Sequence, residues 1–144
     1  MTLLVEVELK TRGMRAADVI PGALLKKTGF DNLPLDPKWC WVATSDGEIC
    51  GVLIGGNMHG IFYMLRIVTA PDSPVETAML LLRKAMRDAL SHGCIGALTY
   101  LDLSKENEKK LLRIGLRAGG SAAATSGVWL AGRADHMRKL GKGE

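Results

Sequence analysis

Residues 61–92 constrain the fold more than any other stretch of this chain. Residues 61–70 are rich in β-branched, aromatic and aliphatic side chains, which pack well on a buried pleated surface and predict a central strand. From residue 75 to residue 90, apolar side chains recur at helical spacing while charged side chains occupy the other side. The stretch therefore predicts a strand that leads through a short turn into a long helix with one buried face.

The turn between these two elements carries the chemistry of a helix start. Ser73 is followed three residues later by Glu76, as in a capping box, and Pro74 falls at the first helical position. We therefore predict a helix that begins at Pro74 and is closed by Gly93 in the left-handed conformation. Because a helix N-terminus at the carboxyl edge of a sheet presents backbone N–H groups, this turn is a candidate site for a phosphorylated ligand.

The rest of the chain predicts a mixed sheet. Two apolar runs, residues 39–44 and 49–54, flank Asp46 and Gly47, which is a strong hairpin signal. Residues 55–60 predict a second turn. Further strands are predicted over residues 3–9, 95–101, 122–125 and 127–131, two helical pieces over residues 11–27, a loop over residues 29–38, and a second helix capped by Asp102 or Ser104 and ended by Gly119. Because a full helix precedes residues 95–101, that strand can lie parallel to residues 61–70. The predicted fold class is α/β (α+β), with a mixed central sheet and helices on both faces.

Composition is that of an ordinary globular domain. The chain has 144 residues, of which 47% are hydrophobic and 24% charged. No apolar run approaches the ~20 residues that a membrane helix needs, and the first residues lack the basic flank of a signal peptide. We therefore expect a cytoplasmic protein with a single domain over residues 1–133 and a basic, flexible tail over residues 134–144.

The cysteines, the histidines and the net charge restrict the chemistry. Cys40, Cys50 and Cys94 are odd in number and widely spaced, so we expect reduced, unbridged and buried thiols. The three histidines do not have the spacing of metal ligands, so we expect no metal. The net charge of +4 permits an acidic ligand, but no aromatic residue interleaves a basic cluster, which argues against nucleic acid.

The second predicted helix has an apolar and a basic side. The side predicted to face inward holds Leu111, Leu112, Ile114 and Leu116, and the outer side holds Lys105, Lys109, Lys110, Arg113 and Arg117. Glu106 stands three and four residues before two of these lysines, which is typical of a solvated face with weak ion pairs. An anionic ligand or partner is the alternative interpretation.

Residues 67–72 read Ile-Val-Thr-Ala-Pro-Asp, and residues 107–119 begin with asparagine and end with glycine. The first run resembles the strand end, and the second the asparagine-led helix, of the GCN5-related N-acetyltransferase superfamily. The order of the predicted elements resembles the family over residues 3–133. The resemblance implies the acyl-CoA N-acyltransferase fold, acetyl-CoA as cofactor, and transfer of an acetyl group to a small-molecule or protein amine.

The resemblance also implies where the cofactor binds. In the family, the splayed end of the central strand pairs with pantetheine, the following turn holds the pyrophosphate on backbone N–H groups, and the asparagine helps to fix the cofactor. The matching cofactor-binding positions are Ile67, Val68, Thr69, Ser73, Val75, Glu76, Thr77 and Asn107.

The sequence departs from the family in two places. The family's pyrophosphate turn offers an Arg or Gln and then glycines, whereas the turn here contains no glycine and no basic residue. The tyrosine that often serves the family as general acid would fall near Ile114 or Gly115, and neither can donate a proton. Catalytic residues therefore stay unassigned. Tyr63, His59 and Asp102 are candidate bases, and each has an ordinary structural role as the alternative.

Two function classes stay open. The first is an acetyl-CoA-dependent N-acetyltransferase. The second is a catalytically degenerate protein of the same fold, of the kind that phages carry, acting as a binding or structural module in a homo-oligomer or protein assembly. Because the capping box would use the N–H groups, Val75 would crowd the turn and Glu76 would repel an anion, we expect coenzyme A to bind weakly or not at all.

Overall fold

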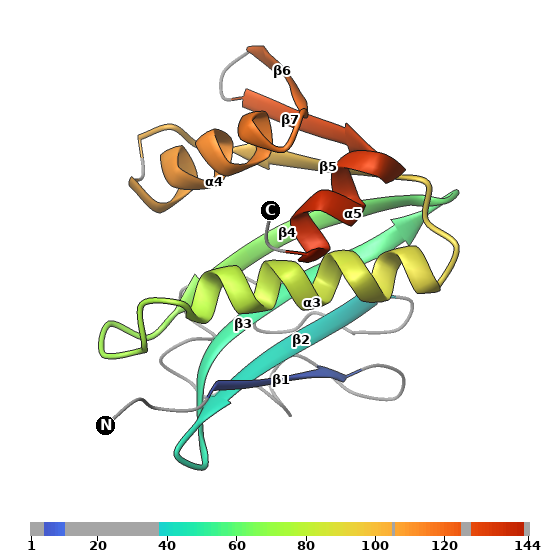
Figure 1. The fold of residues 1–144 in the computed structure, drawn as a ribbon. Helices are drawn as coiled ribbons and strands as arrows, with labels where there is room; N and C mark the ends of the chain where they lie inside the picture. The colour runs from blue at the N-terminus through green and yellow to red at the C-terminus, as the bar shows by residue number, and fades with distance from the viewer. Residues whose placement is uncertain (1–4, 11–37, 105, 125–127, 143–144) are drawn as a thin grey trace.

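The computed structural model describes residues 5–10, 38–104, 106–124 and 128–142 (Figure 1). In chain order its elements are β1 (Val5–Lys10), β2 (Lys38–Ser45), β3 (Glu48–Met58), β4 (Ile61–Thr69), α3 (Thr77–Ser91), β5 (Gly96–Leu101), α4 (Glu106–Arg117), β6 (Ser121–Ala124), β7 (Val128–Arg133) and α5 (Ala134–Lys142). The strands form a seven-stranded sheet in the order β1-β2-β3-β4-β5-β7-β6. The β4 and β5 strands are parallel, as predicted, and the other neighbours are antiparallel. The helical pieces predicted over residues 11–27, and most of the loop after them, lie outside the described residues.

The two predicted turns between β2, β3 and β4 have different outcomes. Asp46 and Gly47 join β2 to β3 with φ angles of 54° and 80°, which confirms the predicted hairpin. The second turn is shorter than predicted, because β3 continues to Met58 and only His59 and Gly60 turn, with φ angles of 54° and 87°. The side chain of Asn57 accepts a hydrogen bond from the Gly60 N–H at 2.8 Å, and this bond stabilises the two-residue turn.

The prediction of a capping box and a helix start at Pro74 is wrong. The α3 helix begins at Thr77, and its N-cap, Glu76, makes no side-chain capping hydrogen bond. Ser73 Oγ instead donates to the Ala70 carbonyl at 2.7 Å, so the serine closes the preceding turn and is not used by the helix. The predicted end of the helix is confirmed, since Gly93 follows it with a φ angle of 89°.

One hydrophobic core joins the sheet to α3, α4 and α5. Its buried members are Trp41, Ala43, Cys50, Leu53, Phe62, Met64, Leu81, Leu82, Ala85, Met86, Ala89, Cys94, Leu101, Leu111 and Met137. A second cluster, Cys40, Val42, Val52 and Ile54, occupies the alternate strand positions and therefore the other face of the sheet. The prediction of helices on both faces of the sheet is not tested for this second face, because the helical pieces predicted over residues 11–27 lie outside the described residues. On α4, Leu116 is 45% exposed, so the prediction that it faces inward is wrong.

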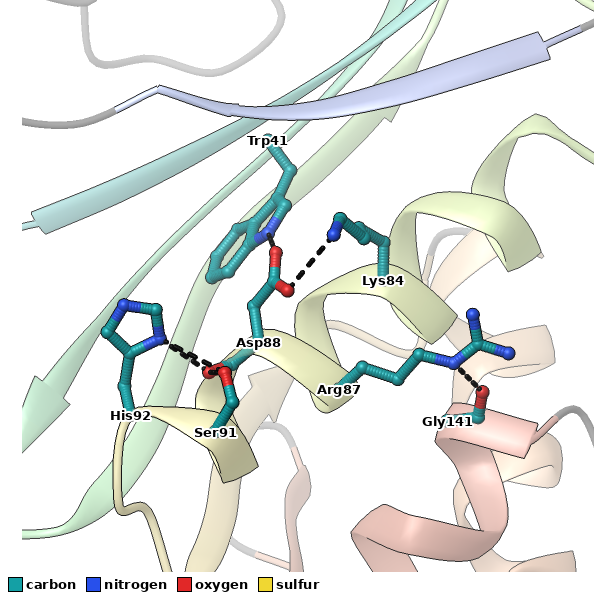
Figure 2. Close-up of polar contacts among 7 residues, drawn as sticks. All are labelled: Trp41, Lys84, Arg87, Asp88, Ser91, His92 and Gly141. Carbon is teal, nitrogen blue, oxygen red and sulfur yellow. Dashed lines mark hydrogen bonds and ion pairs between the residues drawn. The ribbon is translucent and has the colours of Figure 1, made fainter.

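The expected flexible tail is a helix over most of its length. Residues 134–142 form α5, in which Met137 is 1% exposed and belongs to the core. Figure 2 shows Arg87 of α3 donating from Nε to the Gly141 carbonyl at 2.7 Å. The prediction failed because few apolar residues mark this helix, and its close approach to α3 depends on a glycine whose Cβ would meet Arg87 Cγ at 3.1 Å.

Asp88 links helix α3 to strand β2 of the sheet through a hydrogen bond. The Trp41 Nε1 group of β2 donates to Asp88 Oδ2 at 2.8 Å, and Lys84 Nζ lies 3.1 Å from Asp88 Oδ1 (Figure 2). The position of α3 over β2 is therefore set by a polar contact as well as by apolar packing.

The three cysteines are free and buried, as the sequence predicts. Burial raises the pKa of Cys40 to about 12 and also raises the pKa of Cys94. Within the described residues there is no group of three or more metal-ligating side chains, and no helix has the length and apolarity to cross a bilayer.

Candidate functional site

Strands β4 and β5 pair over part of their length and then diverge (Figure 1). Their paired residues run from Ile61 opposite Gly96 to Met64 opposite Thr99. Thr99 Oγ1 donates to the Met64 carbonyl at 2.9 Å, so a buried side chain closes the junction. The next residue, Leu65, has no counterpart in the β3–β4 register, where Gly55 pairs with Met64 and Ile54 with Arg66. This bulge bends β4 away from β5 and opens a cleft between them.

The cleft has a volume of about 310 Å³. It is lined by Met64, Leu65, Arg66, Ile67, Val68 and Thr69 of β4, by Thr99, Tyr100 and Leu101 of β5, and by Glu106, Glu108 and Leu111 of α4. It lies at the carboxyl ends of two parallel strands, the edge at which open α/β sheets bind ligands.

A groove of about 610 Å³ adjoins the cleft. It is lined by Ile67, Thr69 and Ala70 at the end of β4, by Pro71, Ser73, Pro74 and Val75 of the turn, by Ala78 and Met79 of α3, and by Lys110, Leu111 and Ile114 of α4. Ile67, Thr69 and Leu111 line both spaces, so a long ligand could extend from one to the other.

The structure brings together five of the eight predicted cofactor-binding residues. Ile67 and Thr69 line both spaces, Val68 lines the cleft, and Ser73 and Val75 line the groove.

The other three predicted residues are placed differently. Glu76 is exposed at the N-cap of α3 and is not part of either wall. Thr77 is fully buried and packs toward Gly51, whose Cβ would meet Thr77 Cγ2 at 2.8 Å. Asn107 lies in the first turn of α4, and its side chain lies outside what the structure describes.

The start of α3 keeps backbone donors for a ligand. Among the described residues, the N–H groups of Ala78 and Met79 have no hydrogen-bond partner, since Thr77 donates to the Pro74 carbonyl and Leu80 to that of Glu76. Both residues line the groove. Free N–H groups in the first turn of a helix, together with the helix dipole, favour an anion.

Lys110 is a groove residue that the sequence interpretation placed on a solvated face. It lines the groove beside Leu111 and Ile114, on the wall opposite the turn. Lys110 is exposed and gives this groove a positively charged side chain, which the turn lacks. Its place on the same side of α4 as Asn107 was the available signal, because residues three apart in a helix are neighbours. Glu106 and Lys109 do form the expected pair, at 3.3 Å.

Arg66 and Glu108 are two further charged residues that the sequence analysis did not select. Both line the cleft. Glu108 Oε1 accepts a hydrogen bond from the Asp102 N–H at 3.2 Å, but its Oε2 atom is buried without a partner, and so is Arg66 Nε. Buried polar atoms are nearly always hydrogen-bonded, and Ser45 Oγ, Thr77 Oγ1 and Arg83 Nε are further exceptions away from this cleft.

The three candidate bases named from the sequence do not line the cleft. His59 is exposed in the turn between β3 and β4. Tyr63 lies in the part of β4 that pairs with β5. Asp102 Oδ1 accepts hydrogen bonds from both the N–H and the hydroxyl of Ser104, which is the structural role of a loop residue.

No protein-family model and no curated protein sequence matches the chain. Solved structures match it over most of its length. The IAA acetyltransferase from Bacillus cereus ATCC 14579 has a TM-score of 0.68 and 15% identity, over 90% of this chain and 99% of that one. The chain has the GCN5-related N-acetyltransferase fold. This confirms the fold class predicted from the sequence.

Two other solved structures with this fold concern a bound ligand or a named substrate. A GNAT family acetyltransferase from Elizabethkingia anophelis with acetyl-CoA bound has a TM-score of 0.62 and 10% identity, over 90% of this chain and 97% of that one. The ribosomal-protein-S18-alanine N-acetyltransferase from Escherichia coli has a TM-score of 0.62 and 11% identity, over 89% of this chain and 91% of that one. At such identities the likeness concerns the fold, and activity has to be argued from the site.

Proposed function

We propose that the protein transfers an acetyl group from acetyl-CoA to an amine. The observation that carries this proposal is the end of β4–β5 pairing at Met64 and Thr99, which opens a cleft that adjoins a groove at the start of α3. Structures with the same fold are described with acetyl-CoA or coenzyme A bound. Acetyl-CoA would supply an activated thioester carbonyl.

The residues of the two spaces suit the parts of this cofactor. The open edge of Ile67, Val68 and Thr69 offers backbone groups to the amides of pantetheine. The N–H groups of Ala78 and Met79, with Lys110 across the groove, suit the pyrophosphate. Ser73 and Val75 would form the wall beside it. The family resemblance is the reason for proposing Asn107 as a cofactor-binding residue. We propose Glu76 only as a charge near the cofactor, and we assign Thr77 to the core.

Direct attack by the acceptor amine is the reaction that this site supports. Among the described residues no cysteine lines the cleft, and burial holds the pKa of Cys40 at about 12, so a thiolate nucleophile does not fit. Positioning of the amine, with backbone donors for the developing oxyanion, can supply most of the rate enhancement of acyl transfer. Free thiols also support the cytoplasm as the proposed location.

Two of the three reasons for expecting weak coenzyme A binding do not hold. The capping box is absent, and the Val75 side chain is 99% exposed and so does not crowd the backbone. The remaining reason, the charge of Glu76, is opposed by Lys110 on the far wall. Affinity is therefore the quantity that separates an enzyme from a degenerate binding module.

The test is a titration of the protein with coenzyme A, followed by a thiol-release assay with acetyl-CoA and a panel of amines. Coenzyme A at 100 times its Kd should stabilise the protein by about 2.7 kcal/mol, which raises the melting temperature. Absence of both a thermal shift and calorimetric heat at millimolar coenzyme A would contradict the proposal and favour the degenerate module.

A further inference from the structure

A small apolar cavity lies inside the main core, beside the cleft. It has a volume of about 60 Å³ and is bounded by strands β4, β5 and β7 and by helices α3, α4 and α5. Met64, Thr99 and Leu111 line both this cavity and the cleft, so the two spaces adjoin where β4 and β5 stop pairing. The pantetheine and pyrophosphate groups, as placed above, leave this cavity unfilled.

The side chains around the cavity offer no site for a water molecule. The Thr99 hydroxyl is already used, because it donates to the Met64 carbonyl at 2.9 Å. The two ring nitrogens of His136 contact the Arg133 N–H at 3.2 Å and the Asp135 carboxylate at 3.5 Å. The other lining side chains are apolar. Because apolar cavities stay dry and bind apolar groups, a ligand group that fills this one is apolar.

Part of the cavity wall is adaptable. Three of the chain's seven methionines, Met64, Met86 and Met137, line it. A methionine side chain is unbranched and has three rotatable bonds, so it fits groups of different shape. Met64 lies on the boundary with the cleft, where such a side chain can move aside for a ligand.

The cofactor placement proposed above directs the acyl group toward this boundary. The pyrophosphate would lie in the groove at the start of α3, and pantetheine would follow residues 67–69 of β4. From there the cleft continues along β4 to Met64 and Thr99, which are not part of the groove. The thioester at the far end of pantetheine therefore lies next to the cavity, with the acyl chain leading.

We infer that the protein uses short-chain acyl-CoA donors and binds propionyl-CoA and butyryl-CoA more tightly than acetyl-CoA, with the added methylene groups in this cavity. The inference rests on the proposed transferase function and specifies its acyl donor. A water molecule takes about 30 Å³ in the liquid and a methylene group is of similar size, so the cavity of about 60 Å³ holds about two such groups. Butyryl, which adds two methylene groups to acetyl, fills the cavity, and hexanoyl exceeds it.

The bonds that change are the same for each donor. The nitrogen of a neutral amine forms a C–N bond with the acyl carbon as the C–S bond of the thioester breaks. One proton of that nitrogen goes to the leaving thiolate, so one amide and one thiol result. The methylene groups in the cavity affect only how the donor is bound and positioned.

The experiment measures affinity against acyl chain length. Acetyl-, propionyl-, butyryl-, hexanoyl- and octanoyl-CoA are titrated calorimetrically without an amine, and each is then assayed for thiol release with the panel of amines. Burial of each of the first two added methylene groups should tighten binding about fourfold, so butyryl-CoA should bind about 10-fold more tightly than acetyl-CoA. Hexanoyl- and octanoyl-CoA should bind no more tightly than butyryl-CoA, because the cavity is then full.

One variant fills the cavity and another enlarges it. Ala97 lies in β5, packs against the main core and lines the cavity. Ala97→Val adds two methyl groups there and should reduce the advantage of butyryl-CoA to about twofold or less. Its melting temperature should stay the same or rise, because filling a void is stabilising. Leu140→Ala removes part of the α5 wall and should shift the tightest binding to hexanoyl-CoA.

The matched control adds the same two methyl groups elsewhere in the core. Ala85 is 0% exposed and does not line the cavity. Ala85→Val should therefore lower the melting temperature, because it overpacks the core, and should keep the advantage of butyryl-CoA. A folded Ala97→Val protein that keeps this advantage would overturn the inference. If Ala97→Val does not fold, Leu140→Ala decides, and an unchanged length preference in that variant would overturn it as well.

The outcomes separate this inference from the proposed function. Equal affinity for acetyl- and butyryl-CoA, or affinity that keeps rising through octanoyl-CoA, would overturn the inference and leave acetyl transfer in place. A length preference that Ala97→Val removes, without transfer to any amine, would keep the donor site and overturn the transferase. Absence of binding by every acyl-CoA would overturn both.

Discussion

The two halves of β4 have different neighbours and different roles. Ile61–Met64 has partners on both sides, β3 and β5, and contains Phe62 and Met64, which are 0% and 6% exposed. The half from Arg66 to Thr69 pairs with β3 alone and lines the cleft. The Leu65 bulge separates the two halves, so the first half belongs to the paired sheet and the second half forms a wall of the cleft that we propose for the cofactor. Substitutions in the two halves should therefore affect different measurements.

The largest effect is expected in the paired half. Phe62→Ala should lower the free energy of unfolding by about 3–5 kcal/mol, because it leaves a cavity beside the rings of Trp39 and Trp41, whose centroids lie 6.2 and 5.5 Å from that of Phe62. Urea denaturation followed by fluorescence measures the change. The control is Val75→Ala in the turn after β4, where a residue that is 99% exposed should change stability by ~0.5 kcal/mol or less. Equal losses in the two variants would contradict a role of buried Phe62 packing in the stability of the paired half.

The next largest effect on the free energy of unfolding is expected at Met64 and Thr99, where the two halves of β4 meet. Thr99→Val removes the hydroxyl that donates to the Met64 carbonyl at 2.9 Å, which should cost about 1–3 kcal/mol and loosen the mouth of the cleft. Thr77→Val is the matched control, since Thr77 is also buried but its Oγ1 atom has no partner. That control should be neutral or stabilising in the same denaturation experiment. A smaller loss for Thr99 than for Thr77 would show that the bond does not hold the junction.

Substitutions in the open half of β4 and in the groove should change the affinity for coenzyme A and leave the free energy of unfolding unchanged. Lys110→Ala should weaken coenzyme A binding by about 0.5–1 kcal/mol, the scale of a partly exposed ion pair, and the loss should shrink as salt is added. Calorimetry at low and high salt measures this. Lys109→Ala removes the same charge from a residue that is not part of the groove wall and that pairs with Glu106, so it should lose less.

The smallest effect is expected at the exposed turn. Glu76→Gln should strengthen coenzyme A binding by roughly 0.5 kcal/mol or less, because the charge that it removes is exposed and screened. Adding Val75→Gly should contribute little more, since that side chain points into solvent. A titration that finds weaker binding for Glu76→Gln would mean that the carboxylate orders the turn and does not repel the ligand.

Local geometry decided which parts of the fold the sequence could predict. Asp46, Gly47 and Gly93 were predicted correctly because left-handed backbone restricts the residue type at each position. The predicted start of α3 was wrong because the Ser73 side chain could either cap the helix or bond to the preceding turn. In the structure it donates to the Ala70 carbonyl of that turn. The α5 helix was missed because its contact with Arg87 on α3 depends on tertiary packing and not on its own apolar pattern.

The family resemblance selected Ile67, Thr69, Ser73 and Val75, which line the cleft or the groove, but also Glu76 and Thr77, which do not. That any of them binds a cofactor stays a prediction. The resemblance could not select Lys110, Arg66 or Glu108, because the sequence of a helix or strand does not distinguish a charged residue that faces solvent from one that faces a cleft. The bulge and the divergence of β5 decide that question, and both are tertiary features.

The sheet order has a consequence for synthesis of the chain. β7 is translated after β5 and β6, yet it lies between them and pairs with both. While a ribosome has not yet released residues 128–133, one edge of β5 stays open, and β6 lacks the strand with which it pairs in the described sheet. The β1–β4 hairpins, whose partners are consecutive in sequence, can form earlier. Until residues 128–133 are made, the unpaired edge of β5 is therefore the surface at which nascent chains would aggregate.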